Sequence, residues 1–230
     1  MCNRYSLANV EALRRLLEEL GLSAPEELLA RYNIPLSARV PVVTHRGGQT
    51  RLERLAFGAS LPAREPGGRP LLVGNARAET LLQRPAFREA ARRRRCLVPA
   101  DGFYEWEPVG RARRPHHFHR PDGAAFWFAG LWRPGEEPAS GSFVIVTTEP
   151  NAVVAPVHDR MPVLLEPGDA RAWLGDEPLE PELLARLCRP CPPERLARHP
   201  VDPRMNDARF EDPACVRPWQ PPPGEPTLFD

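Results

Sequence analysis

Hydrophobic positions near the start of the chain recur with a helical period. Val10, Leu13, Leu17 and Leu20 fall on one face of a helix, and Gly21 stands where a helix usually ends. The spacing predicts an amphipathic helix that packs against the rest of the protein. Such a helix would hold the residues just before it in a fixed position.

Most of the remaining chain has the pattern of short strands separated by loops. Runs rich in β-branched and aromatic residues predict strands at Val40–Thr44, Leu71–Val73, Cys96–Pro99, Phe103–Trp106, Ala125–Trp132, Phe143–Thr148 and Met161–Leu165. Segments rich in Pro and Gly predict loops at Pro62–Pro70, Glu107–Pro115 and Pro134–Ser142. Two further helices are predicted at Pro85–Arg93 and from Pro181 to near Leu187, each with proline at its first position.

These elements predict an α+β fold with a curved, mostly antiparallel β-sheet core and a few peripheral helices. The sequence contains no internal repeat, no G-x-G-x-x-G and no P-loop, so nucleotide-binding folds have little support. We expect one domain over residues 1–218. A flexible, Pro-rich C-terminal tail over residues 219–230 is expected to follow it.

The composition limits the possible partners. The net charge is +1, so binding to nucleic acid would need a local basic patch rather than the field of the whole protein. All 31 basic residues are arginine. There is no recognisable signal peptide and no apolar run of membrane-spanning length, so we expect no membrane association and a cytoplasmic protein with reduced thiols.

The candidates for metal binding are weak. Cys188 and Cys191 form a CxxC, but no second ligand pair follows at the spacing of a zinc site. His116, His117 and His119 could be a ligand set, although alternation beside aromatic residues favours ordinary core and surface positions for them. We therefore expect no metal and no cofactor.

Cys2 has the most specific candidate chemistry. Removal of Met1 would leave it with a thiol and a free α-amine, and because the chain has no lysine, that amine would be its only primary amine. An α-amine has a pKa of about 7.7–8.0, against about 10.4 for lysine, so more of it is neutral at pH 7. A neutral amine can attack an aldehyde to form an imine, which the thiol can close into a thiazolidine. The alternative is that Cys2 has no role, since termini often fray.

Three more residues could support such chemistry. Glu105 lies between Tyr104 and Trp106, and alternation along the strand would place it on the face of Phe103, pointing inward. An apolar setting there would raise its pKa and suit it to proton transfer; the alternative is a surface glutamate on an edge strand. His158 follows a strand and a loop and titrates near neutrality. Asn75 ends a short strand, where its amide could orient an aldehyde or sugar oxygen.

The chain contains a set of motifs in a fixed order: MCNRY, RYN followed by VPVV, NARAET, RRCLVPADGFYEW, FAGLW, FVIVTTEPN and HDRMP. This ordered set resembles the SRAP (SOS response-associated peptidase) family over about residues 2 to 218. The resemblance implies the SRAP fold, with a partly barrel-like sheet, in a monomeric, nucleoid-associated protein. It also implies an abasic-site processing protein with a lyase-type crosslinking activity. Members capture the ring-opened aldehyde of an abasic site in single-stranded DNA as a thiazolidine.

The resemblance also implies residue roles. Cys2 would be the nucleophile and Asn75 would position the deoxyribose. Glu105 would move protons, and His158 would assist at the sugar oxygen. Removal of Met1, sometimes described in the family as autoproteolysis, would be the maturation step. DNA contacts are implied at Arg4, Asn33, Arg77, Thr148 and Arg160; of these, Arg4 and Arg77 would hold phosphates.

Two positions depart from the family pattern. Members usually have glycine where this chain has Asn3, which could alter how closely DNA approaches Cys2. Members also tend to have a further tryptophan before the NAR motif, but the corresponding segment here has only Phe57 as an aromatic residue. Stacking of a base on an aromatic side chain contributes about 1–3 kcal/mol, so DNA contacts on that side would differ.

Two different functions, and one further partner, fit the same sequence. An N-terminal-nucleophile amidohydrolase also begins Met-Cys, although its four-layer fold needs long helices that this proline-rich chain hardly offers. A non-covalent binder of single-stranded DNA would use the arginines and not Cys2. Separately, Leu228 and Phe229 in the tail resemble short peptides that dock in the bacterial sliding clamp, whereas a tail that folds back or does nothing is the simpler interpretation.

Overall fold

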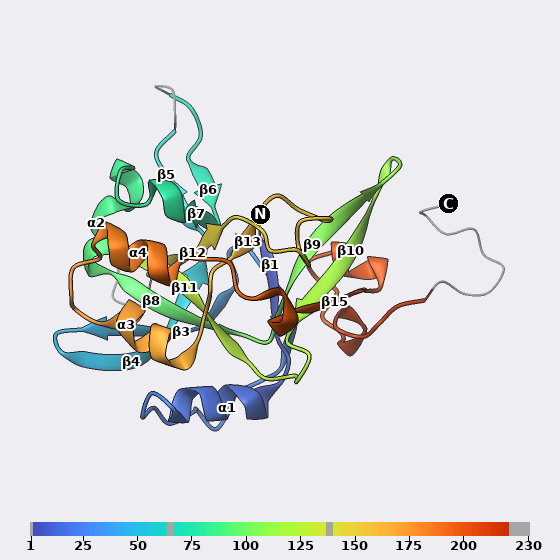
Figure 1. The fold of residues 1–230 in the computed structure, drawn as a ribbon, viewed down its shortest axis with the longest axis horizontal. Coiled ribbons are helices and arrows are strands. Elements are labelled where there is room, and N and C mark those ends of the chain that lie inside the picture. Colours follow the sequence, from blue (N-terminus) through green and yellow to red (C-terminus); the bar gives the residue numbers. More distant parts are fainter. Residues whose placement is uncertain (1, 64–66, 137–139, 221–230) are drawn as a thin grey trace.

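The computed structural model describes residues 2–63, 67–136 and 140–220, and it has two main sheets with four α-helices among the described residues (Figure 1). The α-helices lie against the larger sheet, and the smaller sheet lies beside it. The predicted C-terminal tail falls almost wholly outside the described residues. None of the helices in the described ranges is long and apolar enough to cross a membrane.

The larger sheet closes on itself. Its strands are β3 (Arg39–Arg46), β4 (Gln49–Phe57), β7 (Asn75–Arg77), β8 (Arg95–Ala100), β11 (Phe126–Arg133), β12 (Ser142–Thr148), β13 (Met161–Pro162) and β14 (Leu164–Leu165). The pairing runs β12–β4–β3–β8–β11 and returns from β11 to β12, so these five strands form a ring. Only the pairs of β12 with β4 and β7 are parallel among the described strands. The predicted α+β fold with a mostly antiparallel, barrel-like sheet is therefore confirmed.

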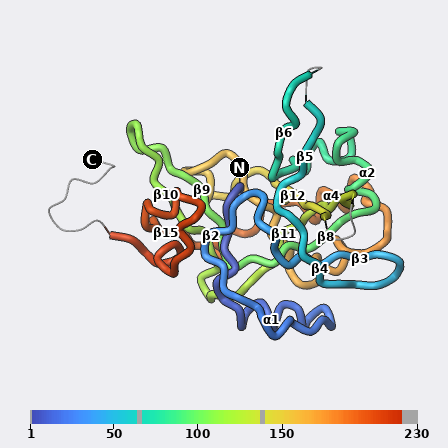
Figure 2. The backbone as a smooth tube through the Cα atoms, turned by 180° about the vertical axis from the view of Figure 1, so that it is seen from behind, coloured from blue at the N-terminus to red at the C-terminus, as the bar shows by residue number. Residues whose placement is uncertain are grey.

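The smaller sheet carries the N-terminal strand in its interior. It has the order β15–β10–β9–β1–β2 and is antiparallel throughout. Its strands are β1 (Arg4–Leu7), β2 (Arg31–Pro35), β9 (Gly102–Val109), β10 (Ala112–His119) and β15 (Ala197–Pro200). A separate hairpin of β5 (Ala59–Leu61) and β6 (Leu71–Val73) projects from the ring, as the view from behind also shows (Figure 2).

Three of the four α-helices in the described ranges lie where the sequence predicts, although the first ends at Glu18, before Leu20. The four helices are α1 (Val10–Glu18), α2 (Pro85–Arg93), α3 (Pro167–Leu174) and α4 (Pro181–Leu187), with short 3₁₀ turns at Ala78–Thr80, Pro193–Arg195, Pro203–Asn206 and Pro213–Cys215. In α1 the side chain of Asn9 accepts from the Ala12 N–H, which caps the helix, and Leu13 and Leu17 are fully buried. The chain leaves α1 through Gly21, whose φ of 74° suits glycine. Helix α3 is the one that the sequence patterns did not predict.

One predicted loop was wrong. Most of Glu107–Pro115 belongs to the hairpin of β9 and β10, which turns at Gly110 with a φ of 57°. The prolines and arginines of this segment resemble a loop in composition, but the ladder continues past them because Pro115 pairs with Trp106 and still offers its carbonyl to the Val201 N–H. Composition alone could not show that pairing.

Aromatic side chains fill the ring's interior. Phe57 is fully buried, stacks on Phe143 at 5.2 Å between ring centroids and meets the edge of Tyr5 at 5.5 Å. We expect Phe57→Ala to lower the free energy of unfolding by about 3–5 kcal/mol, measured by denaturant titration. Leu29→Ala is the control: Leu29 is 76% exposed, and its loss should change stability by no more than about 0.5 kcal/mol. Equal effects of the two changes would contradict this account of the core.

Candidate functional site

Strand β1 holds Cys2 against the smaller sheet. The strand pairs with β2 on one side and β9 on the other, and Tyr5 lies opposite Phe103. Cys2 directly precedes this strand and is 1% exposed, with its Sγ 3.7 Å from the Arg4 carbonyl oxygen. Burial, followed by the negative charge of Glu105, raises the pKa of the Cys2 thiol well above its usual range. The N-terminal segment is therefore anchored and its thiol is held neutral.

Glu105 is a buried carboxyl close to that thiol. It lies on β9 and is 2% exposed, which confirms the prediction that it points inward. Its neighbours Phe103 and Tyr104 are both fully buried, so β9 is covered on both faces here and the simple alternation of inward and outward positions does not hold. Burial raises the pKa of Glu105 to about 7. At neutral pH this carboxyl can therefore both donate and accept a proton.

His158 approaches Glu105 from the loop after β12. Its Nε2 lies 3.8 Å from Glu105 Oε2, and its Nδ1 accepts the backbone N–H of Arg160 at 3.0 Å. Nδ1 also lies 3.0 Å from Asp159 Oδ1, so each ring nitrogen has a carboxylate nearby. Burial lowers the pKa of His158, which favours the neutral ring.

Asn75 is tied to the N-terminal segment by a contact that the sequence did not predict. Its Nδ2 donates to Asn3 Oδ1 at 2.7 Å, and its own Oδ1 is buried without a hydrogen-bond partner among the described residues. Gly74 permits the contact, because a Cβ at that position would lie 2.7 Å from Asn3 Oδ1. The residue that departs from the family pattern thus orients the Asn75 amide.

We expect Asn3→Ala to slow the aldehyde capture that the family resemblance implies by about 10–100-fold. Without Asn3 the Asn75 amide can shift, and a displacement of ~1 Å can reduce a rate about 100-fold. Asn3→Asp keeps an oxygen that accepts from Asn75 Nδ2 and should restore most of the rate. The measurement is the single-turnover rate at saturating substrate. A rate for Asn3→Ala equal to that of the unaltered protein would show that the Asn3–Asn75 contact is dispensable.

A cleft opens beside Asn75. Its volume is about 720 Å³, and its lining includes Asn3, Asn75 and Arg77 together with Leu71 and Leu72 of the β5–β6 hairpin. The two leucines are 47% and 43% exposed, which is high for such large apolar side chains. Asn75 and Arg77 are two residues apart on β7, and both line this cleft.

Arg4 and Asn33 are hydrogen-bonded to each other and to the C-terminal segment. Arg4 Nη1 donates to Asn33 Oδ1 at 2.7 Å and to the Met205 carbonyl at 3.1 Å. Asn33 is fully buried, and its amide donates to the carbonyls of Met205, Asp207 and Phe210. Asn33 therefore positions Arg4 and the C-terminal segment and does not reach the surface itself.

Arg160 and Thr148 lie where β12 ends. The guanidinium of Arg160 makes a bidentate pair with Glu79 at 2.8 and 2.9 Å and donates to the Thr147 carbonyl at 2.7 Å. Thr148 is 4% exposed and pairs with Met161. Both residues fix the loop that carries His158, and Glu79 is a partner that sequence reasoning missed.

The CxxC cysteines are separate from this group. Cys188 and Cys191 are both unpaired thiols and buried, and burial raises their pKa values to about 12 and about 11. Asn151 donates to the Cys191 carbonyl and lies 3.6 Å from its sulfur. These contacts place the two cysteines in the core.

The family profile described as SOS response associated peptidase (SRAP) matches residues 1–208. The chain belongs to the SRAP family. Among relatives of this SRAP protein, abasic site processing protein YoqW of Bacillus subtilis is 29% identical over 223 residues, covering 94% of this chain and 99% of the relative. Abasic site processing protein YedK of Escherichia coli is 27% identical over 229 residues, covering 95% and 100%. A crystal structure of a Bacteroides thetaiotaomicron protein has the same fold, with a TM-score of 0.73 at 22% identity, covering 95% of this chain and all of that one.

Proposed function

We propose that this SRAP protein is an abasic-site processing protein that captures the ring-opened aldehyde of an abasic site in single-stranded DNA through Cys2. One observation carries the proposal: the N-terminal cysteine is anchored beside a buried carboxyl of pKa about 7. The names of the relatives YoqW and YedK support the substrate class. Removal of Met1 is the maturation step that frees the α-amine.

The first step is imine formation. The neutral α-amine of Cys2 attacks C1′ of the ring-opened sugar and gives a carbinolamine. Glu105 in its protonated form donates to the departing hydroxyl, water leaves, and an iminium remains. Asn75 Oδ1, which has no partner among the described residues, can accept a hydrogen bond from a sugar hydroxyl and so hold C1′ in place.

The second step closes the ring. The thiol is neutral, so it needs a base when its sulfur attacks the iminium carbon. Glu105 left the first step as a carboxylate and takes the thiol proton, which regenerates its acid form. The sum is one amine, one thiol and one aldehyde giving one thiazolidine and one water. His158, whose Nε2 lies 3.8 Å from Glu105 Oε2, assists at the sugar oxygen during both proton transfers.

Ring closure also protects the DNA strand. An iminium at C1′ acidifies C2′ and favours β-elimination of the 3′ phosphate, which breaks the strand. The thiazolidine has no iminium, so the strand survives as a protein adduct. The placement of the thiol beside the amine decides between the two outcomes.

The DNA strand would pass on both sides of Cys2. Arg77 lies in the cleft with Asn75, and we propose that it holds a phosphate there. Arg4, Thr148 and Arg160 are proposed along the same path, although Arg160 would then have to share its guanidinium with Glu79. Asn33 acts through Arg4. The exposed Leu71 and Leu72 offer an apolar surface to a base on the side that lacks the family's tryptophan.

In the test, protein whose mass confirms the removal of Met1 is mixed with a single-stranded oligonucleotide that bears one abasic site. A band shifted on a denaturing gel without borohydride supports the proposal. A tetrahydrofuran abasic analogue, which has no aldehyde, is the matched control and should give no shift. Binding to both oligonucleotides with no covalent band would instead support a non-covalent binder of single-stranded DNA.

An amidohydrolase function has less support. The longest α-helices in the described ranges have nine residues, too short for the layers of an N-terminal-nucleophile amidohydrolase. Docking of Leu228 and Phe229 in a sliding clamp stays a prediction, because both lie outside the described residues.

A further inference from the structure

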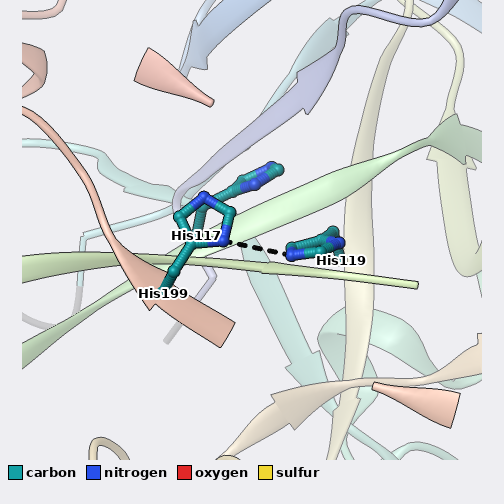
Figure 3. A group of neighbouring side chains, drawn as sticks. All are labelled: His117, His119 and His199. Carbon is teal, nitrogen blue, oxygen red and sulfur yellow. Dashed lines mark hydrogen bonds between the residues drawn. The ribbon is translucent and has the colours of Figure 1, made fainter. Parts of the chain in front are cut away.

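Three histidines gather on one face of the smaller sheet, away from the capture chemistry. His117 and His119 are two residues apart on β10 and share a face, and His199 of β15 is the register partner of His117 (Figure 3). One possible ligand atom from each ring lies within 4.8 Å of the others. The sequence suggested His116 as the third member, but that ring bonds to Glu107 Oε2 at 2.9 Å.

The outward nitrogens of two rings are fixed by backbone carbonyls. His119 Nδ1 donates to the Arg120 carbonyl at 2.9 Å, and His199 Nε2 donates to the Val216 carbonyl at 3.0 Å. A carbonyl can only accept, so both protons lie on these outward nitrogens. The remaining lone pairs, on His119 Nε2 and His199 Nδ1, face each other at 3.1 Å.

That spacing suits a shared metal ion. Two nitrogens at about 2.0–2.1 Å from a tetrahedral Zn²⁺ are about 3.3 Å apart. A backbone carbonyl on the second ring nitrogen is the usual outer contact of a metal-binding histidine, because it fixes the tautomer and the ring orientation.

His117 supplies the third lone pair. Its Nε2 lies 3.0 Å from Ser6 Oγ, and that hydroxyl donates to Asp101 Oδ1 at 2.6 Å. Ser6 therefore accepts from His117, whose Nδ1 is buried with no partner among the described residues. The ring is 5% exposed.

The cluster borders a cavity of about 320 Å³, which is also lined by Ala8, Asn9, Asp101, Gly123 and Val216. A fourth ligand from solvent fits there. We propose that His117, His119 and His199 bind a divalent transition-metal ion, with Zn²⁺ the best match to three neutral imidazoles. The ion would join β10 to β15 and so brace the segment whose Met205 carbonyl receives Arg4.

The test uses metal-free, untagged full-length protein carrying Cys2→Ala, because the aminothiol itself could chelate a metal. One equivalent of Co²⁺ should bind and give the visible absorption bands of a tetrahedral site. Zn²⁺ should displace the Co²⁺ and raise the melting temperature of the protein. His119→Gln and His199→Gln should each weaken binding by at least about 10–100-fold. His45→Gln is the matched control, since His45 pairs with Asp176 elsewhere.

Melting curves recorded without metal establish whether each variant folds. One folded variant, His119→Gln or His199→Gln, is sufficient for the test. Absence of tetrahedral Co²⁺ bands in the Cys2→Ala protein would overturn the proposal. Bands of equal strength and affinity in His119→Gln or His199→Gln would overturn it as well. Neither readout depends on DNA, so failure here leaves the capture function untouched.

Discussion

Replacement of Cys2 by alanine should abolish the stable crosslink to abasic DNA and turn protection into strand cleavage. Met1 should still be removed before the small alanine, so the variant keeps an α-amine and can form the imine. Without a thiol the iminium cannot close into a ring, and β-elimination becomes its main forward route. The measurement is a denaturing gel that separates intact oligonucleotide, crosslink and cleaved strand over time, with and without borohydride.

Two controls sharpen this result. Cys188→Ala removes another buried thiol and should crosslink like the unaltered protein. A variant with one residue inserted between Met1 and Cys2, in a sequence that retains Met1, keeps the thiol but loses its adjacent amine and should neither crosslink nor cleave. A stable, borohydride-independent crosslink from Cys2→Ala would show that another residue is the nucleophile.

The sequence predicted those parts of the fold that depend on local patterns. The spacing of Leu13 and Leu17 predicted α1, and proline at the first helical position marked Pro85 and Pro181 as the starts of α2 and α4. Alternation with Phe103 predicted that Glu105 points inward, and it does, although β9 is covered on both faces there. Most predicted strands were confirmed in place because each is a short run of mainly hydrophobic residues, but Met161–Leu165 is divided into β13 and β14.

Contacts between distant segments could not be predicted in this way. The Asn3–Asn75 hydrogen bond depends on a close approach over Gly74, and His199 joins His117 only through the register of β10 with β15. Closure of the ring through β11 and β12 is likewise a matter of pairing and curvature. Neither spacing nor composition encodes these distances, because each depends on how separate strands align.

Glu105 illustrates why a site residue can oppose stability. A carboxyl that is 2% exposed destabilises the fold when it ionises, since the shift from 4.5 to about 7 corresponds to about 3 kcal/mol. The native state binds the proton more tightly than the unfolded chain does. Stability relative to an uncharged side chain is therefore unaffected below pH 4.5 and falls as the pH rises from 4.5 to about 7.

Glu105→Gln should accordingly slow crosslinking while stabilising the protein. We expect the single-turnover rate to fall by about 10²–10⁴-fold, the usual contribution of a general acid–base group. In the unaltered protein the loss of a proton from the α-amine, of pKa about 7.7–8.0, should raise the rate as the pH rises. Ionisation of Glu105 near pH 7 should lower the rate. Together they give a bell-shaped pH profile with its maximum between the two pKa values. In the variant the falling limb should disappear, because glutamine does not titrate.

The second readout is the free energy of unfolding, measured by denaturant titration at pH 8 and pH 4. The variant should be more stable by about 3 kcal/mol at pH 8, and this gain should vanish at pH 4, where Glu105 is protonated in both states. Glu107→Gln on the same strand is the matched control for the rate, since its side chain is 29% exposed and pairs with His116, and it should leave the rate unchanged. A bell-shaped profile that persists in Glu105→Gln would assign the proton transfers to another group. The rate and the stability should thus move in opposite directions, an outcome that simple damage to the fold cannot produce.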